Sequence, residues 1–184
     1  MLSVLVPYIL TTELSPLLEK ASDSRVIHTS SYMHHFAKIK DLDFGFETNY
    51  NPGLAYNNSK LYTIWMTRYL ARDFFLRGSS ITVNAYHPGL ISTNLGNDSS
   101  DEKAKKSLFG RLMKSFSKNL DEGIETGYYL TLSEEITGLT GYYFDEKKVK
   151  SVSEKGYTLE KAKDLINYCN DKIELFKQKH SQIN

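Results

Sequence analysis

The chain has 184 residues, and its 23 Lys and Arg residues against 22 Asp and Glu residues give a net charge of +1 at pH 7. This balance excludes a strongly basic nucleic-acid-binding protein and an acidic, solvated tail, so we expect no nucleic-acid partner. With 40% hydrophobic and 24% charged residues, the composition is that of a folded protein, and the length fits a single domain over residues 1–184. The only cysteine, Cys169, excludes a disulfide framework and a Cys-rich zinc site, and it fits a reducing compartment.

The first segment of the chain, from Leu2 to Leu10, is apolar. No basic residues stand ahead of it and no small-residue cleavage site follows, so it lacks the pattern of a signal peptide. It is also far too short for the ~20 apolar residues that span a bilayer. We expect a helix over residues 3–20 with apolar residues on most faces, which would be largely buried in the core.

Short segments rich in β-branched and aromatic residues alternate with helical patterns farther along the chain. The clearest helix covers residues 54–77, where apolar pairs recur at steps of four or five and Gly78 follows as a stop signal. Strands are expected at 25–30, 81–86 and 138–144, further helices at 108–116, 120–132 and 158–179, and a turn-rich stretch at 31–53. Alternating strands and helices predict βαβ units, a parallel sheet and right-handed crossovers.

Tyr56 and Lys60 are the first candidate functional residues. They stand four residues apart in the expected helix, so both side chains lie on one face, one turn apart. A free tyrosine has a pKa of about 10, and a nearby ammonium group stabilises the phenolate and lowers that value. Such a pair can act as a general acid and base. Taken alone the spacing is common by chance, and the alternative is a half-buried tyrosine beside a solvated lysine.

Two further motifs stand at the ends of the strands on either side of that helix. Ser30 and Ser31 end the strand before it, where a hydroxyl group can hold a substrate carbonyl. The strand after it is followed by Pro88-Gly-Leu-Ile-Ser-Thr93. Because α/β proteins bind ligands at the carboxyl ends of parallel strands, we expect all of these residues at one edge of the sheet.

The order of these motifs resembles the short-chain dehydrogenase/reductase family, over nearly the whole chain. The family has a serine at a strand end, then Tyr-x-x-x-Lys, then Pro-Gly-x-x-x-Thr. The segments Val26–Ser31, His34-His35 and Tyr86–Gly89 are similar to the retinol dehydrogenase and WW-domain oxidoreductase branch. The resemblance implies an α/β fold with a Rossmann-like doubly wound parallel sheet. It also implies NAD(P)-dependent interconversion of an alcohol and a carbonyl, the substrate being retinol-like, lipid-like or a xenobiotic carbonyl.

The resemblance also implies a role for each matching residue. Tyr56 would exchange a proton with the substrate oxygen, and Ser31, favoured over Ser30, would polarise that oxygen. Lys60 would promote ionisation of the tyrosine and bind the nicotinamide ribose. The remaining contacts to the nicotinamide would come from Tyr56 itself and from Pro88, Gly89, Ile91 and Thr93. Residues 96–120 would form a variable lid over the substrate.

Three features of the family pattern are absent from this sequence. There is no Gly-rich phosphate-binding turn opening a helix, and no residue beyond such a turn that selects NAD or NADP. Ser3 stands where the family has an asparagine that feeds a proton relay. We therefore expect a truncated Rossmann-like sheet without its N-terminal strands, an impaired catalyst, and NADP or NAD as cofactor, with NADP slightly favoured.

A second hypothesis is a truncated, non-catalytic family member that acts as an interaction or dimerisation module. In a truncated sheet the strand at 25–30 and its apolar helices would be exposed, which favours pairing with a second copy or with a full-length relative. A chance match in an unrelated α/β binding protein is the remaining alternative. His34 and His35 lack a ligand cluster, so we expect no metal, and His87 is interpreted as a packed strand-end residue. The expected location is the cytoplasm or the periphery of an intracellular membrane.

Overall fold

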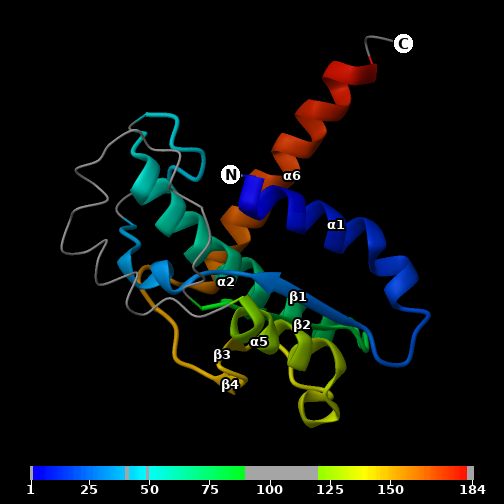
Figure 1. The fold of residues 1–184 in the computed structure, drawn as a ribbon. Coiled ribbons are helices and arrows are strands. Elements are labelled where there is room, and N and C mark those ends of the chain that lie inside the picture. Colours follow the sequence, from blue (N-terminus) through cyan, green and yellow to red (C-terminus); the bar gives the residue numbers. More distant parts are fainter. Residues whose placement is uncertain (1, 40–41, 49, 90–119, 182–184) are drawn as a thin grey trace, which may run out of the picture.

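A four-stranded sheet in the order β1-β2-β3-β4 organises the computed structural model, which describes residues 2–39, 42–48, 50–89 and 120–181 (Figure 1). β1, β2 and β3 are parallel to one another, and β4 is antiparallel to β3. The strands are β1 (Arg25–Thr29), β2 (Thr82–Tyr86), β3 (Tyr143–Asp145) and β4 (Lys148–Val149). The helices are α1 (Leu2–Leu18), η1 (Tyr32–Phe36), α2 (Pro52–Leu76), α5 (Leu120–Leu132), η2 (Glu134–Ile136) and α6 (Leu159–Ser181).

Helices cover both faces of this sheet, as a doubly wound α/β fold requires (Figure 1). Successive residues of β1 point to opposite faces. Val26 accordingly packs with the core formed by α1, α2 and α6, whereas Ile27 packs with the cluster around Leu130 of α5. The predicted fold class, a Rossmann-like α/β arrangement built from alternating strands and helices, is confirmed.

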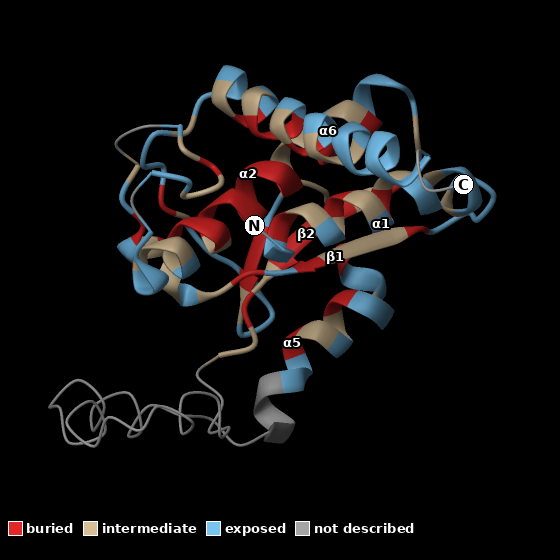
Figure 2. Ribbon diagram, turned by 90° about the horizontal axis from the view of Figure 1, so that it is seen from above, coloured by how far each residue is buried: buried red, intermediate tan, exposed pale blue. Residues whose placement is uncertain are grey.

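Helix α2 is the centre of the larger core (Figure 2). It begins where the Asn51 side chain accepts a hydrogen bond from the Leu54 amide at 2.9 Å, and Pro52 occupies its first turn. Its apolar stripe is buried, with Trp65 fully enclosed, and it ends before Gly78, whose φ of 71° is favourable for glycine. The expected helix over residues 54–77 is therefore confirmed to within two residues at its start.

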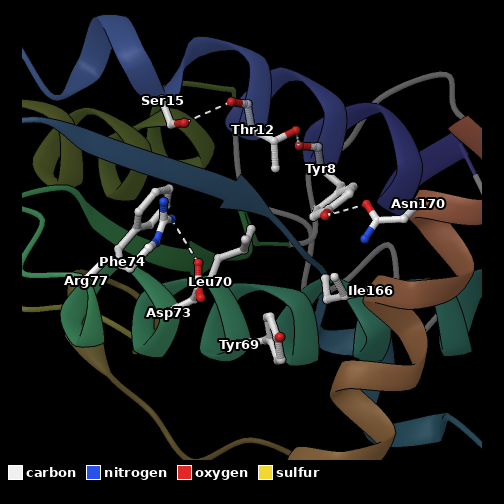
Figure 3. A pocket seen from close by; sticks show the side chains of 10 residues that line it. All are labelled: Tyr8, Thr12, Ser15, Tyr69, Leu70, Asp73, Phe74, Arg77, Ile166 and Asn170. Carbon is white, nitrogen blue, oxygen red and sulfur yellow. Dashed lines mark hydrogen bonds and ion pairs between the residues drawn. The ribbon is translucent and has the colours of Figure 1, made fainter. Parts of the chain in front are cut away.

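Helix α1 contains two prolines, and hydroxyl groups replace the hydrogen bonds that the prolines cannot make. Pro7 cannot donate to the Ser3 carbonyl, which instead accepts from Thr63 Oγ1 of α2 at 3.4 Å. Pro16 leaves the Thr12 carbonyl free, and Ser15 Oγ donates to it at 2.9 Å (Figure 3). The bond from Ser15 compensates for Pro16, whereas Thr63 also donates to the Ser59 carbonyl at 2.9 Å and gives the Ser3 carbonyl only a weak, shared bond.

The outer side of α1 corrects one expectation. We expected a largely buried helix, but only Val4, Tyr8 and Thr11 are buried. A stripe of five apolar side chains at steps of three or four is 44–76% exposed; its members are Leu2, Val6, Leu10, Leu14 and Leu17. The periodicity identified apolar faces on most sides of the helix, but α2 and α6 cover only one of them.

Strand β1 lies at the end of the sheet beside this stripe. The Ser24 carbonyl and the Ser30 amide both bond to β2, at 2.9 and 2.7 Å. The backbone groups of the odd-numbered residues Arg25, Ile27 and Thr29 therefore point to the other edge, because these groups alternate along a parallel strand. No strand in the described part of the chain pairs with that edge, which agrees with the exposed strand expected from the sequence.

Two smaller features were missed by the sequence reasoning. The strand expected within 138–144 is β3, and it turns back into β4 through Glu146 and Lys147, whose φ angles are 50° and 62°. The stretch at 31–53 was expected to be irregular but includes η1. The short helix expected at 108–116 lies outside the described residues.

Candidate active site

The first part of the site is one turn of α2. Tyr56 and Lys60 lie on the same face of the helix, and Lys60 Nζ is 5.6 Å from the centre of the Tyr56 ring. Tyr56 is 44% exposed, so part of the residue is open to solvent. Lys60 is half-buried, and burial lowers the pKa of its ammonium group. The predicted proximity of a phenol and an ammonium group is confirmed.

The end of β1 approaches this turn of α2 through two hydrogen bonds. Ser30 is buried, and its Oγ donates to the Lys60 carbonyl at 2.8 Å. Lys60 Nζ in turn donates to the Thr29 carbonyl at 3.2 Å. Lys60 is therefore held at both its backbone and its side chain by consecutive residues of the strand end.

Ser31, the expected hydrogen-bond donor to the substrate oxygen, begins the short helix η1. Its backbone is extended, with φ of −158° and ψ of 151°, and its Oγ accepts a hydrogen bond from the Met33 amide at 3.3 Å. Accepting this bond leaves the hydroxyl proton free to be donated elsewhere. Ser30 Oγ bonds to α2 and Ser31 Oγ to the Met33 amide, so the two neighbouring hydroxyl groups have different partners.

The end of β2 supplies the Pro88-Gly89 part of the motif. The parallel pairing of β1 and β2 places their carboxyl ends at the same edge of the sheet, and the Ser30 amide donates to the Tyr86 carbonyl at 2.7 Å. Gly89 has a φ of 84°, a value that disfavours a residue with a Cβ. Ile91, Thr93 and residues 96–119 of the expected lid lie outside the described residues, whereas residue 120 begins α5.

His87 has a structural position at this strand end. It is buried, its Nε2 lies 3.1 Å from Asp145 Oδ1, and its Nδ1 accepts the Gly89 amide proton at 2.9 Å. Both ring nitrogens therefore bond to groups that shape the turn after β2. This agrees with its interpretation as a packed strand-end residue.

A nicotinamide cofactor needs a donor for its ribose and a turn that holds its pyrophosphate. Lys60 presents a cationic donor beside Tyr56, and an ammonium group has three protons, of which Thr29 uses one, so a ribose hydroxyl can still be bound. The described residues thus fit the nicotinamide-ribose end of a dinucleotide. The sequence has no Gly-rich turn opening a helix to hold a pyrophosphate. No cluster of three or more metal-binding side chains occurs within the described ranges.

Two hollows in the described part of the molecule adjoin α1. A groove of about 500 Å³ runs between α1 and the open edge of β1, and both Ser3 and Lys60 line it. A second hollow of about 460 Å³ lies between α1, α2 and α6 (Figure 3). Its charged groups, Asp73 and Arg77, pair with each other at 2.9 Å, and it is lined by none of the three candidate reacting residues.

Sequence reasoning missed three contributions to the site. It did not assign Thr29 as the partner of the Lys60 ammonium group, or Ser30 as the residue that fixes the Lys60 backbone. It left His34 in a turn-rich stretch without a role, yet this side chain is fully buried and bonds to Ser31. The alternation along β1 is the one available signal, because it places Ser30 on the same side as His28, toward α2.

The chain is similar to known dehydrogenases over most of its length. It is 34% identical to human retinol dehydrogenase 14 over 170 residues, which are 92% of this chain and 50% of that protein. It is also 34% identical to human retinol dehydrogenase 12 over 160 residues, 87% of this chain and 49% of that protein. The chain spans about half the length of the curated relatives it matches. No family model matches it.

Solved structures support the same fold. A short chain dehydrogenase from Salmonella enterica serovar Typhi superposes with a TM-score of 0.52 at 22% identity, over 79% of this chain and 50% of that chain. The NADPH-bound carbonyl reductase from chicken fatty liver gives 0.50 at 24% identity, over 79% of this chain and 52% of that chain. At these identities the likeness establishes the arrangement of helices and strands alone.

Proposed function

Because this chain belongs to the short-chain dehydrogenase/reductase family, in its retinol dehydrogenase-like branch, we propose that it carries the reacting half of an NAD(P)-dependent oxidoreductase. The reaction is the interconversion of an alcohol and a carbonyl compound. The observation that supports it best is the meeting of Tyr56, Lys60 and the Ser30-Ser31 strand end at one edge of the sheet.

The proton steps follow from these positions. When bound, a nicotinamide cofactor supplies a hydride to the carbonyl carbon, or accepts one from the alcohol carbon. In the reducing direction Tyr56 Oη donates its proton to the substrate oxygen, so the C=O bond becomes a hydroxyl group and the tyrosine becomes a phenolate. Ser31 Oγ–H donates a hydrogen bond to the same oxygen and stabilises the charge that develops there. The exposed phenolate then regains a proton from water.

Lys60 has two tasks in this proposal. Its ammonium group stabilises the phenolate of Tyr56, and its remaining protons bind the nicotinamide ribose. Ser3 lines the same groove as Lys60, which supports a relay role for Ser3 in place of the family's asparagine. Its shorter side chain is one reason to expect an impaired catalyst.

The substrate class that we propose is an apolar alcohol or aldehyde of the retinoid or lipid kind, or a xenobiotic carbonyl. Tyr32 and Phe36 support it, because both aromatic side chains of η1 are exposed in the segment that follows Ser31. The names of the retinol dehydrogenase relatives point in the same direction. The family supports a nicotinamide cofactor, and NADP remains our slight preference over NAD. Within the described residues no helix is both long and apolar enough to cross a membrane, and our proposed location remains cytoplasmic or peripheral to an intracellular membrane.

Cofactor titration tests this proposal directly. The purified chain is titrated with NADPH and with NADH while the fluorescence of the reduced nicotinamide is followed, and retinal is then added to start turnover. We expect saturable binding that Lys60→Ala weakens at least tenfold. Tyr56→Phe should weaken binding less than Lys60→Ala does and should abolish turnover, because it removes the hydroxyl group that exchanges the proton. A folded chain that binds neither cofactor contradicts the proposal.

The exposed side of the molecule supports a second candidate function, an interaction module without catalysis. The open edge of β1 and the exposed stripe of α1 border one groove, which is a surface suited to pairing with another chain. We propose that its partner is a second copy or a longer relative. Failure of cofactor binding together with self-association of the folded chain would favour this candidate over the enzyme.

A further inference from the structure

We infer that His34 is a positioning residue for Ser31: it holds the Ser31 carbonyl so that the Ser31 hydroxyl group faces the substrate. This inference rests on the proposed function, in which Ser31 donates a hydrogen bond to the substrate oxygen. The role differs from that of Ser30, which fixes Lys60 from the opposite side of the same strand end.

Two hydrogen bonds from one residue converge on the Ser31 carbonyl. The His34 amide donates to it at 3.1 Å, and His34 Nδ1 donates to it at 2.7 Å. The amide bond is an ordinary part of the 3₁₀ turn, but the side-chain bond is additional and shorter. Because the carbonyl is held twice, rotation of the Ser31 peptide is restricted.

The surroundings of His34 fix its ring in one state. The side chain is completely buried, and it packs edge-on against the Tyr143 ring at 4.9 Å and against the His35 ring at 3.9 Å. Burial lowers the pKa of His34 to about 4, the neighbouring His35 and His87 rings act in the same direction, and the bond to Ser31 acts against them. The ring is therefore neutral at pH 7. Since Nδ1 faces a carbonyl oxygen, the single ring proton resides on Nδ1.

Burying a histidine at this position is unfavourable, and the Nδ1 bond is what offsets the unfavourable free energy. The other ring nitrogen, Nε2, is buried without a hydrogen-bond partner in the described structure, and burying such a group without a partner is unfavourable. An apolar side chain of similar size could fill the space without this penalty. The property that a histidine supplies here and an apolar residue does not is the bond to Ser31.

The consequence is a defined direction for the Ser31 hydroxyl group. The carbonyl is held by His34 and Oγ accepts from the Met33 amide, so the hydroxyl proton points away from both of these bonds and can be donated to a ligand. A prepositioned donor stabilises a developing oxyanion more than a mobile one, because no reorganisation is needed during the reaction.

Two substitutions distinguish positioning from packing. In His34→Asn the side-chain amide nitrogen takes the place of Nδ1, so the bond to the Ser31 carbonyl is retained. In His34→Leu the space is filled and the donor is lost. His180→Leu is the matched control, because its Nδ1 also bonds to a backbone carbonyl, that of Phe176 at 2.9 Å, but in an exposed helix end.

The readouts are kcat for retinal reduction, the dissociation constant of NADPH, and hydrogen exchange of the Met33 amide measured by NMR. We expect His34→Leu to lower kcat roughly 10- to 100-fold, the effect of a small misplacement of a reacting group, with NADPH affinity unchanged. Met33 exchange should accelerate at least tenfold in the same variant. His34→Asn should restore most of both quantities, and His180→Leu should change neither.

Two results would overturn the inference. The first is that Met33 exchange and kcat remain at wild-type values in His34→Leu. The second is that His34→Asn and His34→Leu change both quantities equally, which would indicate a packing role. If the wild-type chain shows no turnover at all, the proposed function fails. In that case the Met33 exchange rates of the two variants alone decide whether His34 fixes Ser31.

Discussion

His28 is buried at the interface between β1 and two helices. Its Nδ1 lies 2.9 Å from Thr67 Oγ1 of α2, and its Nε2 lies 3.2 Å from Thr11 Oγ1 of α1. Each ring nitrogen thus lies within hydrogen-bond distance of a threonine hydroxyl, and the side chain joins the two helices beneath the strand. Burial lowers the pKa of His28 to about 4, so the ring is neutral in the folded chain at pH 7.

This buried histidine predicts a pH-dependent stability. In the unfolded chain His28 binds a proton below its ordinary pKa of about 6.5, whereas the folded chain resists protonation down to about pH 4. The free energy of unfolding should therefore decrease as the pH falls from 7 toward 4. At pH 5 the contribution of this one group is about 2 kcal/mol. Urea unfolding at pH 7 and pH 5 measures it.

His28→Gln provides the control, because glutamine can bond to a threonine hydroxyl but does not titrate. The difference in unfolding free energy between pH 7 and pH 5 should shrink by about 2 kcal/mol in this variant, whatever its stability at pH 7. An unchanged difference would show that His28 is already protonated in the folded chain at pH 5 or that the unfolded value is shifted as well.

The serine pair shows what can be predicted at the scale of single residues. The sequence placed Ser30, Ser31, Tyr56 and Lys60 at one edge of a sheet, because strand ends and a helical spacing of four are visible as patterns. It favoured Ser31 as the reacting serine, and that choice stays a prediction. It could not assign the bonds from Ser30 to the Lys60 carbonyl and from Lys60 to Thr29, since these depend on how α2 packs against β1.

Among the elements, α2 connects stability to the candidate site. Its first turn depends on the Asn51 side chain, which accepts the Leu54 amide at 2.9 Å, and Tyr56 follows in the next turn. If the start of α2 unwinds, Tyr56 is therefore displaced before Lys60, which lies one turn farther along the helix.

Asn51→Ala removes this cap and should lower the free energy of unfolding by about 1 kcal/mol. Asn51→Asp keeps a side-chain oxygen in the same place and should remain within a few tenths of a kcal/mol of the wild-type chain. Urea unfolding followed by circular dichroism compares the three proteins. Equal stability of the alanine variant would mean that tertiary packing alone fixes the start of α2.

The accuracy of the predicted elements followed the length of their patterns. The pattern of α2 extends over many turns, and its bounds were predicted closely. The hairpin between β3 and β4 was missed because its turn uses Glu146 and Lys147 at positive φ rather than the usual asparagine and glycine. The burial of α1 was overestimated because an apolar face does not reveal whether another element covers it.

At the scale of the whole molecule, β1 is the edge strand of the sheet in the described part of the chain, and no described strand pairs with its outer edge. On one side of this strand the exposed stripe of α1 consists of Leu2, Val6, Leu10, Leu14 and Leu17, and on the other side α5 exposes Ile124, Tyr128 and Leu132. The edge of β1 and the stripe of α1 border one groove, and α5 adds exposed apolar side chains on the other face of the sheet; together they are called the border here. Such a border favours association, because pairing would cover apolar area and satisfy strand groups together.

We expect the purified chain to self-associate with increasing concentration. The double substitution Leu10→Glu and Leu14→Glu places two charges in the stripe and should shift the sedimentation coefficient toward that of a monomer. Leu175→Glu is the matched control, since this leucine is similarly exposed but lies on α6, away from the border. A monomer at all concentrations in the wild-type chain, or an equal shift in the control, would contradict this expectation.

The burial of Cys169 has a practical consequence. This thiol is the only one in the chain, it is fully enclosed in the packed face of α6, and burial raises its pKa to about 12. Thiolate, the form that reacts with alkylating agents, is therefore nearly absent while α6 is docked. The rate at which a thiol reagent labels the native protein consequently reports how often α6 detaches. Labelling of Cys169 therefore measures the local opening of this helix.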